Sequence, residues 1–333
     1  MNRRMNHEVR LKYRPIGMPK ESDFEIAETA VPEPGEGEVL VRNIFLSVDP
    51  YMLGRMYERK SYVPPFALGK PLDGGCVGEV VQSGHEKYRT GDYVLGSKGW
   101  REYYVSEGSE ITKIDTSAVP AETYLGVMGM PGMTAYYGLL HIGQPREGQT
   151  VFVSAASGAV GSVVCQIAKI KGCRILGSAG SDEKIRWLTE EAGIDAAINY
   201  KKTDDLTAEV GSHCPDGIDI YFDNVGGTHL EAAIEHMNNN GRLVLCGMIS
   251  QYAGQRSGPR NIFLAVSKRL LLQGFIIRDH QDIRGQFYKD MGRWITEGRI
   301  RWKDTVVEGI ENAPAAFLGL FSGDNVGKML VKV

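Results

Sequence analysis

The second half of the chain repeats one pattern, and this pattern constrains the fold more than any other feature of the sequence. A short apolar segment is followed by a turn of small residues and then by a stretch with helical periodicity, for example Val160, Val163 and Ile167. The segments with the composition of buried strands are residues 151–154, 174–177, 197–199, 218–222, 243–246 and 271–276. Six strands alternating with helices predict an α/β fold with a doubly wound parallel sheet.

The first part of the chain, up to about residue 115, has a different pattern of short strands and turns. Residues 38–45 and 78–82 are rich in β-branched side chains, and further strands are expected at 93–95 and 100–105. Strand character returns after residue 300. Because the parallel sheet is already complete, we expect this tail to rejoin an irregular β-domain formed by the first part. For 333 residues, two domains are the expected number.

Composition excludes several classes of partner. The chain carries 38 Lys and Arg residues against 41 Asp and Glu, a net charge of −3, with both signs spread along the sequence. No basic surface is therefore expected for nucleic acid or for an anionic membrane. No segment has the length and apolarity of a transmembrane helix. The 41 glycines are about twice the usual share, which indicates many tight turns and close contacts of the backbone with a ligand.

The cysteines and the N-terminus bear on location. The chain has five cysteines, an odd number, and no two are separated by two residues, so neither a disulfide scaffold nor a zinc knuckle is indicated. A reduced, cytoplasmic protein is the expectation. The arginine-rich N-terminus lacks the apolar run of a secretory signal, while a mitochondrial presequence, which is also rich in arginine, stays open as an alternative.

Residues 151–161 (VFVSAASGAVG) form the main functional motif. A strand leads through small residues into a helix, whose backbone N–H groups can approach a pyrophosphate where no Cβ atom intervenes. Gly158 lies where that approach is needed, and Gly161 allows the helix to pack on the strand. Ala156 replaces the first glycine of the usual G-x-G-x-x-G pattern, so the position within a βαβ unit carries the interpretation. A glycine-rich packing turn is the alternative.

The end of the second strand indicates which dinucleotide binds. Enzymes that use NAD tend to place an acid there for the adenine ribose, about 20 residues after the glycines. Residues 178–180 (SAG) contain none, and the helix dipole explains Asp182 in the first turn of a helix capped by Ser181. Lys184 can reach a 2′-phosphate, and Tyr200 follows the third strand. We therefore expect NADPH, with a merely solvated Lys184 as the alternative.

Two further strands end in glycine turns, at residues 223–227 (DNVGG) and 246–248 (CGM). Both turns are expected at the carboxyl edge of the sheet, where a dinucleotide and its substrate bind. Three such turns at one edge predict a ligand cleft.

Motifs spread over nearly the whole chain resemble those of one family. They are residues 45–52 (FLSVDPYM), 130–136 (MPGMTAY), 155–162 (AASGAVGS), 222–227 (FDNVGG), 246–252 (CGMISQY) and 325–328 (NVGK). In this order they are similar to zinc-independent members of the medium-chain dehydrogenase/reductase superfamily. The resemblance is to the branch of prostaglandin reductases, alkenal double-bond reductases and curcumin reductases.

The resemblance implies a Rossmann NADP-binding domain at residues 126–301 and a GroES-like catalytic domain formed by residues 1–125 and 302–333. It also implies NADPH-dependent reduction of the carbon–carbon double bond of α,β-unsaturated ketones or aldehydes. The motifs carry dinucleotide contacts over to Thr134, Gly158, Ala159, Val160, Gly161, Lys184, Tyr200, Asn224, Cys246, Gly247, Met248, Ile249, Ser250, Gln251, Tyr252, Phe275, Ile276, Ile277 and Asn325. Substrate tyrosines map to Tyr51 and Tyr252, and the less similar loop at 55–66 is expected to help define the substrate.

No catalytic metal is expected. In zinc alcohol dehydrogenases a Gly-His-Glu motif precedes a glycine-rich strand, and the corresponding residues 69–75 (GKPLDGG) lack histidine. His85 and Glu86 lie instead in a hairpin, where both are expected to be exposed. Zinc needs three or four convergent ligands, and Cys76 and Cys165 form no such pattern.

Without a metal, hydrogen-bond donors must stabilise the charge that develops on the substrate. Hydride addition to the β-carbon moves negative charge to the carbonyl oxygen as an enolate, and the α-carbon is then protonated. Tyr252, just past the end of a strand, is the first candidate for stabilising the enolate or delivering the proton. A zinc-free NADPH quinone oxidoreductase and a non-catalytic NADPH-binding protein are the alternatives, and the Tyr51 motif counts against the first.

The last predicted strand, within residues 270–277 (LLLQGFII), is long and apolar. An exposed strand of this kind is an aggregation hazard. We therefore expect a two-fold homodimer that pairs this edge across the axis.

Overall fold

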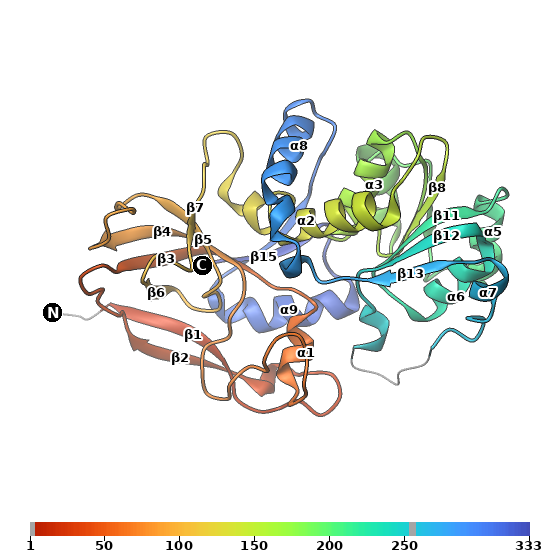
Figure 1. The fold of residues 1–333 in the computed structure, drawn as a ribbon. Coiled ribbons are helices and arrows are strands. Elements are labelled where there is room, and N and C mark those ends of the chain that lie inside the picture. Colours follow the sequence, from red (N-terminus) through yellow and green to blue (C-terminus); the bar gives the residue numbers. More distant parts are fainter. Residues whose placement is uncertain (1–3, 253–257) are drawn as a thin grey trace. The chain divides into compact units, whose positions relative to one another are not determined.

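The computed structural model describes residues 4–252 and 258–333. The chain divides into two units, the first formed by Met1–Gly126 with Asp304–Val333 and the second by Val127–Lys303 (Figure 1).

The second unit is built on a six-stranded sheet. Its strands are β8 (Thr150–Val153), β9 (Arg174–Ala179), β10 (Ala196–Asn199), β11 (Ile218–Asp223), β12 (Met237–Leu245) and β13 (Leu271–Gly274). Every neighbouring pair is parallel, and the spatial order is β10-β9-β8-β11-β12-β13. The order reverses between β8 and β11, which makes this the switch point of a doubly wound Rossmann sheet. The predicted fold class is confirmed.

The second unit also contains helices, which pack on this sheet or on one another. They are α2 (Met130–Tyr137), which continues as a π-helix (Gly138–Gly143), α3 (Gly161–Ile170), α4 (Asp182–Arg186), which continues as a π-helix (Trp187–Glu191), α5 (Leu206–His213), α6 (Gly227–His236), α7 (Leu264–Ser267) and α8 (Arg284–Thr296). Phe152, Tyr221 and Leu243 lie in one core cluster with side chains of α5 and α6. Ser181 caps α4 as predicted, because its Oγ accepts from the backbone N–H of Lys184 at 3.4 Å.

The first unit contains two sheets. β1 (Met5–Leu11) and β2 (Phe24–Ala30) form an antiparallel pair. The larger sheet has the order β14-β15-β3-β4-β5-β7, with β6 on β3. Its strands are β3 (Val39–Ser47), β4 (Cys76–Ser83), β5 (Tyr93–Gly96), β6 (Tyr103–Ser106), β7 (Thr112–Lys113), β14 (Asp304–Glu308) and β15 (Lys328–Lys332), and its helices are α1 (Met52–Met56) and α9 (Ala313–Ser322).

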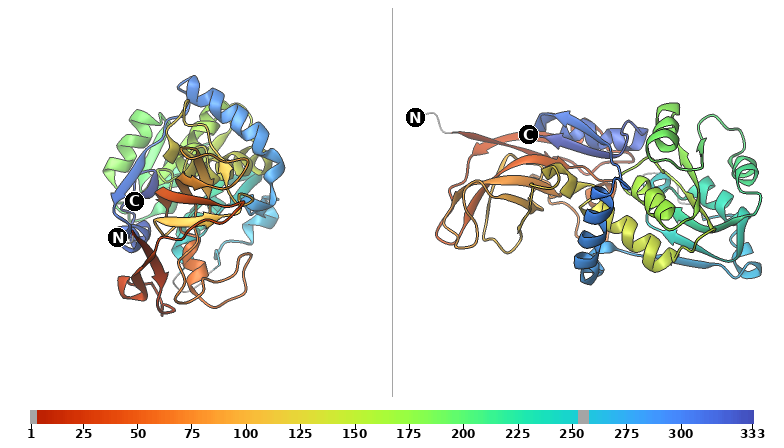
Figure 2. Two further views of the ribbon diagram at one scale, coloured as in Figure 1. Left: turned by 90° about the vertical axis from the view of Figure 1, so that its left-hand side faces the viewer. Right: turned by 90° about the horizontal axis from the view of Figure 1, so that it is seen from above.

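The tail rejoins the first part of the chain, as expected. β15 pairs antiparallel with β3, so that Leu330 faces Ser47, and β14 pairs parallel with β15. The blue C-terminal segment accordingly lies beside the red and orange strands of this unit in Figure 2.

Several predicted boundaries were wrong for identifiable reasons. β12 starts at Met237 instead of 243. The asparagines at 238–240 are disfavoured in strands, so the sequence does not indicate this earlier start. The strand predicted at 100–105 starts only at Tyr103, because Trp100 has a φ of 59° and packs its buried ring on Phe24. β13 ends at Gly274 instead of 276.

In the part of the chain that is described, no helix combines the length and the apolarity needed to span a membrane.

Candidate functional site

The candidate site is the edge of the six-stranded sheet at which the parallel strands end. β9, β8, β11 and β12 are neighbours in this order and run in the same direction. The segments that follow them therefore meet at one edge, around the switch point between β8 and β11.

The turn after β8 is tight and leads directly into α3. Ala155 has a φ of 46°, and the backbone N–H of Ala156 donates to the Ser178 carbonyl on β9 at 2.9 Å. A Cβ atom at Gly161 would collide with the carbonyl oxygen of Ala155 and approach the Cα of Ala156 within 2.9 Å. A Cβ atom at Gly158 would meet only the Ala155 oxygen, at 3.3 Å. Gly161 is thus required by packing within the chain, whereas a Cβ atom at position 158 would make one tight contact with a backbone oxygen.

A buried aspartate at the end of β11 ties the ends of three strands together. Asp223 is fully buried, and its Oδ1 accepts from Ser154 Oγ (3.2 Å), Tyr221 Oη (2.7 Å) and the backbone N–H groups of Val225 and Gly226 (3.0 and 2.8 Å). Its backbone carbonyl accepts from Cys246 and Gly247 at 3.0 Å each. Burial raises the pKa of Asp223 against the opposing hydrogen bonds. This network fixes the backbone of the two predicted glycine turns.

Ser154 and Asp223 were not among the predicted site residues. The available signal was an acid directly after an apolar strand, in the run 218–223 (IDIYFD). Ser154 also holds Asn224 in place. The backbone N–H of Asn224 donates to Ser154 Oγ at 2.9 Å, and its Nδ2 donates to the Ser154 carbonyl at 2.8 Å.

The segment after β12 folds back over the turn after β11. The backbone N–H of Ile249 donates to the Asn224 carbonyl, and that of Ser250 donates to the Val225 carbonyl, both at 3.2 Å. Ser250 Oγ also donates to the Val225 carbonyl at 2.6 Å. The Oη of Tyr252 lies against Gly247, 3.1 Å from where a Cβ atom would stand. The predicted residues 246–252 are therefore brought together with Asn224.

The end of β9 carries no acid, and the nearby Asp182 is engaged by its neighbours. Lys202 Nζ donates to one carboxylate oxygen of Asp182 at 2.5 Å and Asn199 Nδ2 to the other at 2.7 Å. These hydrogen bonds lower the pKa of Asp182. The carboxylate is thus held by residues at the end of β10 and just after it.

Tyr200 and Lys201 both reach back over the end of β9. A Cβ atom at Gly180 would stand 3.1 Å from Tyr200 Oη and 3.1 Å from Lys201 Cε. Tyr200 is 37% exposed, and its ring packs edge-on against His229, with 4.9 Å between ring centroids. Lys201 is a further cation at this position that the prediction did not include.

Four predicted cofactor residues of the second unit lie on other elements. Thr134 is buried in α2, where its Oγ1 donates to the Met130 carbonyl at 2.7 Å. Phe275, directly after β13, packs its ring on Tyr137 of α2 at 5.5 Å. Ile276 and Ile277 follow it.

Tyr51 and Asn325 belong to the first unit. Tyr51 directly precedes α1, and burial together with the charge of Asp49 raises the pKa of its phenol. Asn325 Nδ2 donates to the Gly327 carbonyl at 2.7 Å. The roles that the resemblance gives them stay predictions.

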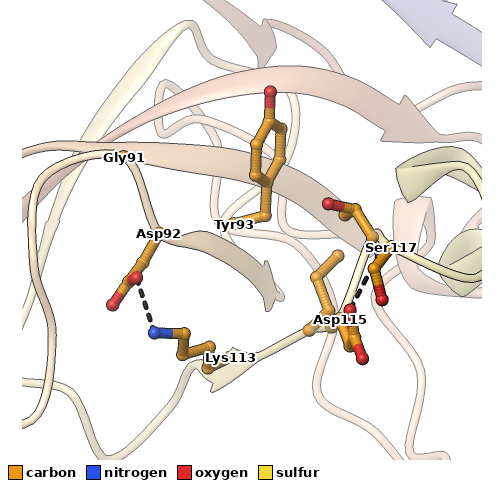
Figure 3. A pocket seen from close by; sticks show the side chains of 8 residues that line it. Gly91, Asp92, Tyr93, Lys113, Asp115 and Ser117 are labelled. Carbon is orange, nitrogen blue, oxygen red and sulfur yellow. Dashed lines mark hydrogen bonds and ion pairs between the residues drawn. The ribbon is translucent and has the colours of Figure 1, made fainter.

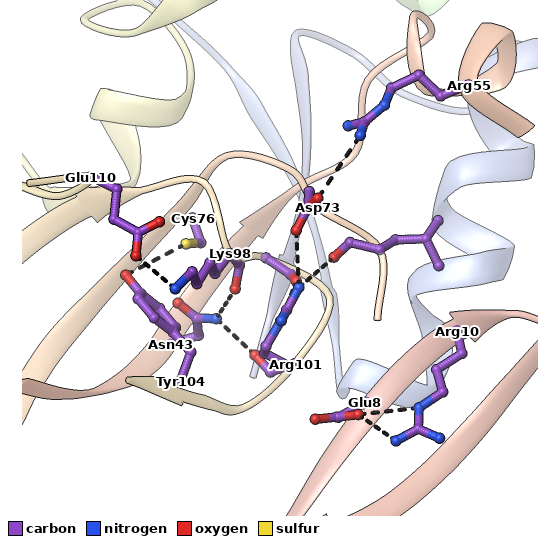
Figure 4. Close-up of polar contacts among 12 residues, drawn as sticks. Glu8, Arg10, Asn43, Arg55, Asp73, Cys76, Lys98, Arg101, Tyr104 and Glu110 are labelled. Carbon is purple, nitrogen blue, oxygen red and sulfur yellow. Dashed lines mark hydrogen bonds and ion pairs between the residues drawn. The ribbon is translucent and has the colours of Figure 1, made fainter. Parts of the chain in front are cut away.

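The loop at 55–66 is anchored by Arg55. Its guanidinium stacks on the Phe66 ring at 4.0 Å, donates to the Pro64 carbonyl at 3.0 Å and lies 3.8 Å from Asp73. Asp73 in turn contacts Arg101 at 3.2 Å, as Figure 4 shows.

The described residues contain no group of three or more His, Cys, Asp or Glu side chains that could hold a metal ion.

His85 is half-buried, contrary to expectation, because its ring packs edge-on against Tyr88. The surface pocket in Figure 3 lies beside the Gly91 turn, and its lining includes the ion pair between Asp92 and Lys113 (2.6 Å).

The fold and its carboxyl-edge turns define a dinucleotide-binding unit joined to a β-rich unit. Comparisons with known proteins agree with this. Residues 7–114 match a family described as N-terminal domain of oxidoreductase, and residues 159–296 match one described as zinc-binding dehydrogenase. The chain therefore belongs to the medium-chain dehydrogenase/reductase superfamily, in the branch of curcumin, 2-alkenal and prostaglandin reductases.

Individual relatives match over nearly their full length. NADPH-dependent curcumin reductase of Escherichia coli is 43% identical over 330 residues, covering 97% of this chain and 95% of the relative. The NADP-dependent 2-alkenal reductase of Nicotiana tabacum is 45% identical over 335 residues, covering 98% and 97%. The crystal structure of CurA from Vibrio vulnificus in complex with NADPH is 42% identical, covers 98% of this chain and 99% of that one, and superimposes with a TM-score of 0.94.

Proposed function

We propose that this protein is an NADPH-dependent reductase of the carbon–carbon double bond in α,β-unsaturated ketones and aldehydes. The observation that carries the proposal is full-length similarity, at 43 to 45% identity, to relatives named curcumin reductase and 2-alkenal reductase. The substrate class common to these relatives is a carbonyl conjugated to a double bond.

The residues of the second unit fit NADPH. The Gly158 turn offers backbone N–H groups at the start of α3 to a pyrophosphate. No acid stands at the end of β9 to repel a 2′-phosphate. Lys184 lies in α4, which follows this strand, and Tyr200 and Lys201 reach Gly180 just after its end. Asn224 and residues 246–252 would hold the rest of the dinucleotide, with Thr134, Phe275 to Ile277 and Asn325 as further contacts.

The chemistry divides between the cofactor and the chain. When bound, NADPH supplies the hydride that adds to the β-carbon of the substrate. The chain orients the substrate and donates hydrogen bonds to the carbonyl oxygen, where charge develops, since preorganised donors are usually the largest catalytic contribution. We assign this role to Tyr252 and Tyr51, with Tyr252 the first candidate for proton delivery to the α-carbon.

Steady-state oxidation of NADPH with a panel of enones, enals and quinones tests the proposal. We expect turnover with enones and enals, a saturated product, and much weaker turnover with NADH. Turnover with quinones alone would identify a quinone oxidoreductase. Two solved structures of that class are each 20% identical to this chain and share its fold. Binding of NADPH without turnover of any acceptor would identify a non-catalytic binding protein.

We further propose a homodimer formed through β13. This strand lies at the edge of the sheet. Its first residue, Leu271, is 42% exposed, and Phe263 and Val266, which precede it in the chain, are 68% and 82% exposed. Pairing of two such edges would cover both the free backbone groups and the apolar side chains. A monomer in light scattering at micromolar concentration would contradict this, and the cytoplasmic location expected from the cysteines is tested by fractionation of cells.

A further inference from the structure

A lysine ammonium is buried in the first unit, beside the segment that carries Tyr51. Lys328, the first residue of β15, is 3% exposed. Its Nζ donates to the backbone carbonyls of Val48 (2.7 Å) and Met329 (2.8 Å) and lies 3.2 Å from Asp49 Oδ1. A buried cation is tolerated only when it is paired and hydrogen-bonded in this way.

Two of the partners of Lys328, Val48 and Asp49, lie in the turn between β3 and α1. Asp49 is 6% exposed, and its second carboxylate oxygen accepts from Ser47 Oγ at 2.5 Å. Its backbone carbonyl accepts from the N–H of Met52 at 3.1 Å, and Tyr51 stands between these residues as the last residue before α1. Lys328 therefore fixes the turn at two points, one and two residues before Pro50.

The charge of Lys328 also acts on its surroundings. Burial and, after it, the charge of Asp49 raise the pKa of the Tyr51 phenol, and Lys328 is the cation paired with Asp49. Asp304 at the start of β14 faces the same ammonium, and burial raises the pKa of Asp304 to about 6. One buried cation thus serves two acids, so its loss would leave Asp49 uncompensated next to Tyr51.

We propose that Lys328 is a positioning residue for Tyr51, acting through Asp49 to set the place and the local field of the phenol during substrate reduction. This inference rests on the proposed function of the Tyr51 phenol. Lys328 itself contacts neither substrate nor cofactor in this role.

A double-mutant cycle tests the inference. Lys328→Met and Tyr51→Phe are made singly and together, and kcat, KM for an enone and the Kd of NADPH are measured on folded protein. We expect Lys328→Met to lower kcat about tenfold or more, with the Kd of NADPH changed less than about twofold. In the Tyr51→Phe background the same substitution should change kcat little, because the route through the phenol is already lost.

Lys332 supplies the matched control. It lies on the same strand, but it is 48% exposed and pairs with Glu308 at the surface, so Lys332→Met should behave as the wild type. If Lys328→Met does not fold, Asp49→Asn replaces it in the cycle, since this variant keeps the ammonium and its two carbonyl acceptors.

The outcomes are distinguishable. Wild-type kcat in Lys328→Met, or an equal loss in the presence and absence of Tyr51, overturns the inference and leaves Lys328 as a purely structural ion pair. Absence of enone reduction by the wild-type protein overturns the proposed function instead.

Discussion

Replacing His229 should remove a pH dependence from the stability of the second unit. His229 lies in the first turn of α6, is 3% exposed, and has no partner for Nε2 among the described residues. Burial lowers the pKa of His229 to about 4, from an ordinary value of 6.5. Between these values the unfolded chain binds a proton at this side chain and the folded chain does not, so the free energy of unfolding falls as the pH falls.

The size of the effect follows from the two pKa values. Between about pH 7.5 and about pH 5, linkage predicts a loss of about 2 kcal/mol from this one side chain. His229→Leu, which is similar in volume and cannot be protonated, should not show this loss. Asp304 acts in the opposite direction, because its raised pKa makes the folded state gain protons in the same range, but its contribution cancels when variant and wild type are compared.

Urea midpoints followed by far-UV circular dichroism at both pH values measure the difference. His213→Leu is the control, because the His213 side chain is 36% exposed at the surface of α5, and it should retain the wild-type pH dependence. Equal pH dependence in the wild type and His229→Leu would refute the reasoning that a neutral histidine is buried here.

Three further predictions concern the proposed site. Lys184→Ala should raise the KM for NADPH at least about tenfold and leave NADH use nearly unchanged, because only NADPH carries the phosphate. Equal losses with both cofactors in steady-state assays would show that Lys184 supports the shared part of the dinucleotide or the fold. Tyr252→Phe should lower kcat on the order of 100-fold where that donor acts alone, with near-normal NADPH affinity by fluorescence titration; wild-type turnover would leave Tyr252 as a wall of the pocket. Dialysis against a strong chelator should leave activity intact, and inactivation that zinc reverses would contradict the metal-free assignment.

The dinucleotide-binding sheet was predictable because its signals are local. Each strand, its turn and the following helix lie within one short segment, and the Ser181 cap and the Gly161 turn can be seen in the sequence itself. The strand order then follows from the rules of right-handed crossover connections.

The polar networks of the site were not predictable in this way. Asp223 meets Ser154 across 69 residues, and Lys328 reaches the Val48 carbonyl across 280. The residue type alone does not distinguish a buried acid that joins strands from a catalytic or a solvated acid. Only the packing of the strand ends distinguishes them.

This difference explains why the sequence predicts the cofactor better than it predicts the substrate. The cofactor edge is made of backbone turns, whose shape is encoded where they occur. The loop at 55–66 depends instead on Arg55, whose guanidinium joins Pro64, Phe66 and Asp73, the last of which is held by Arg101 from β6's preceding turn. Since each of these contacts is set by the partner as much as by Arg55, changes in several separated residues can reshape this loop while the dinucleotide turns stay intact. We therefore expect differences in enone preference among close relatives to follow substitutions at these anchoring positions more closely than substitutions in the glycine turns.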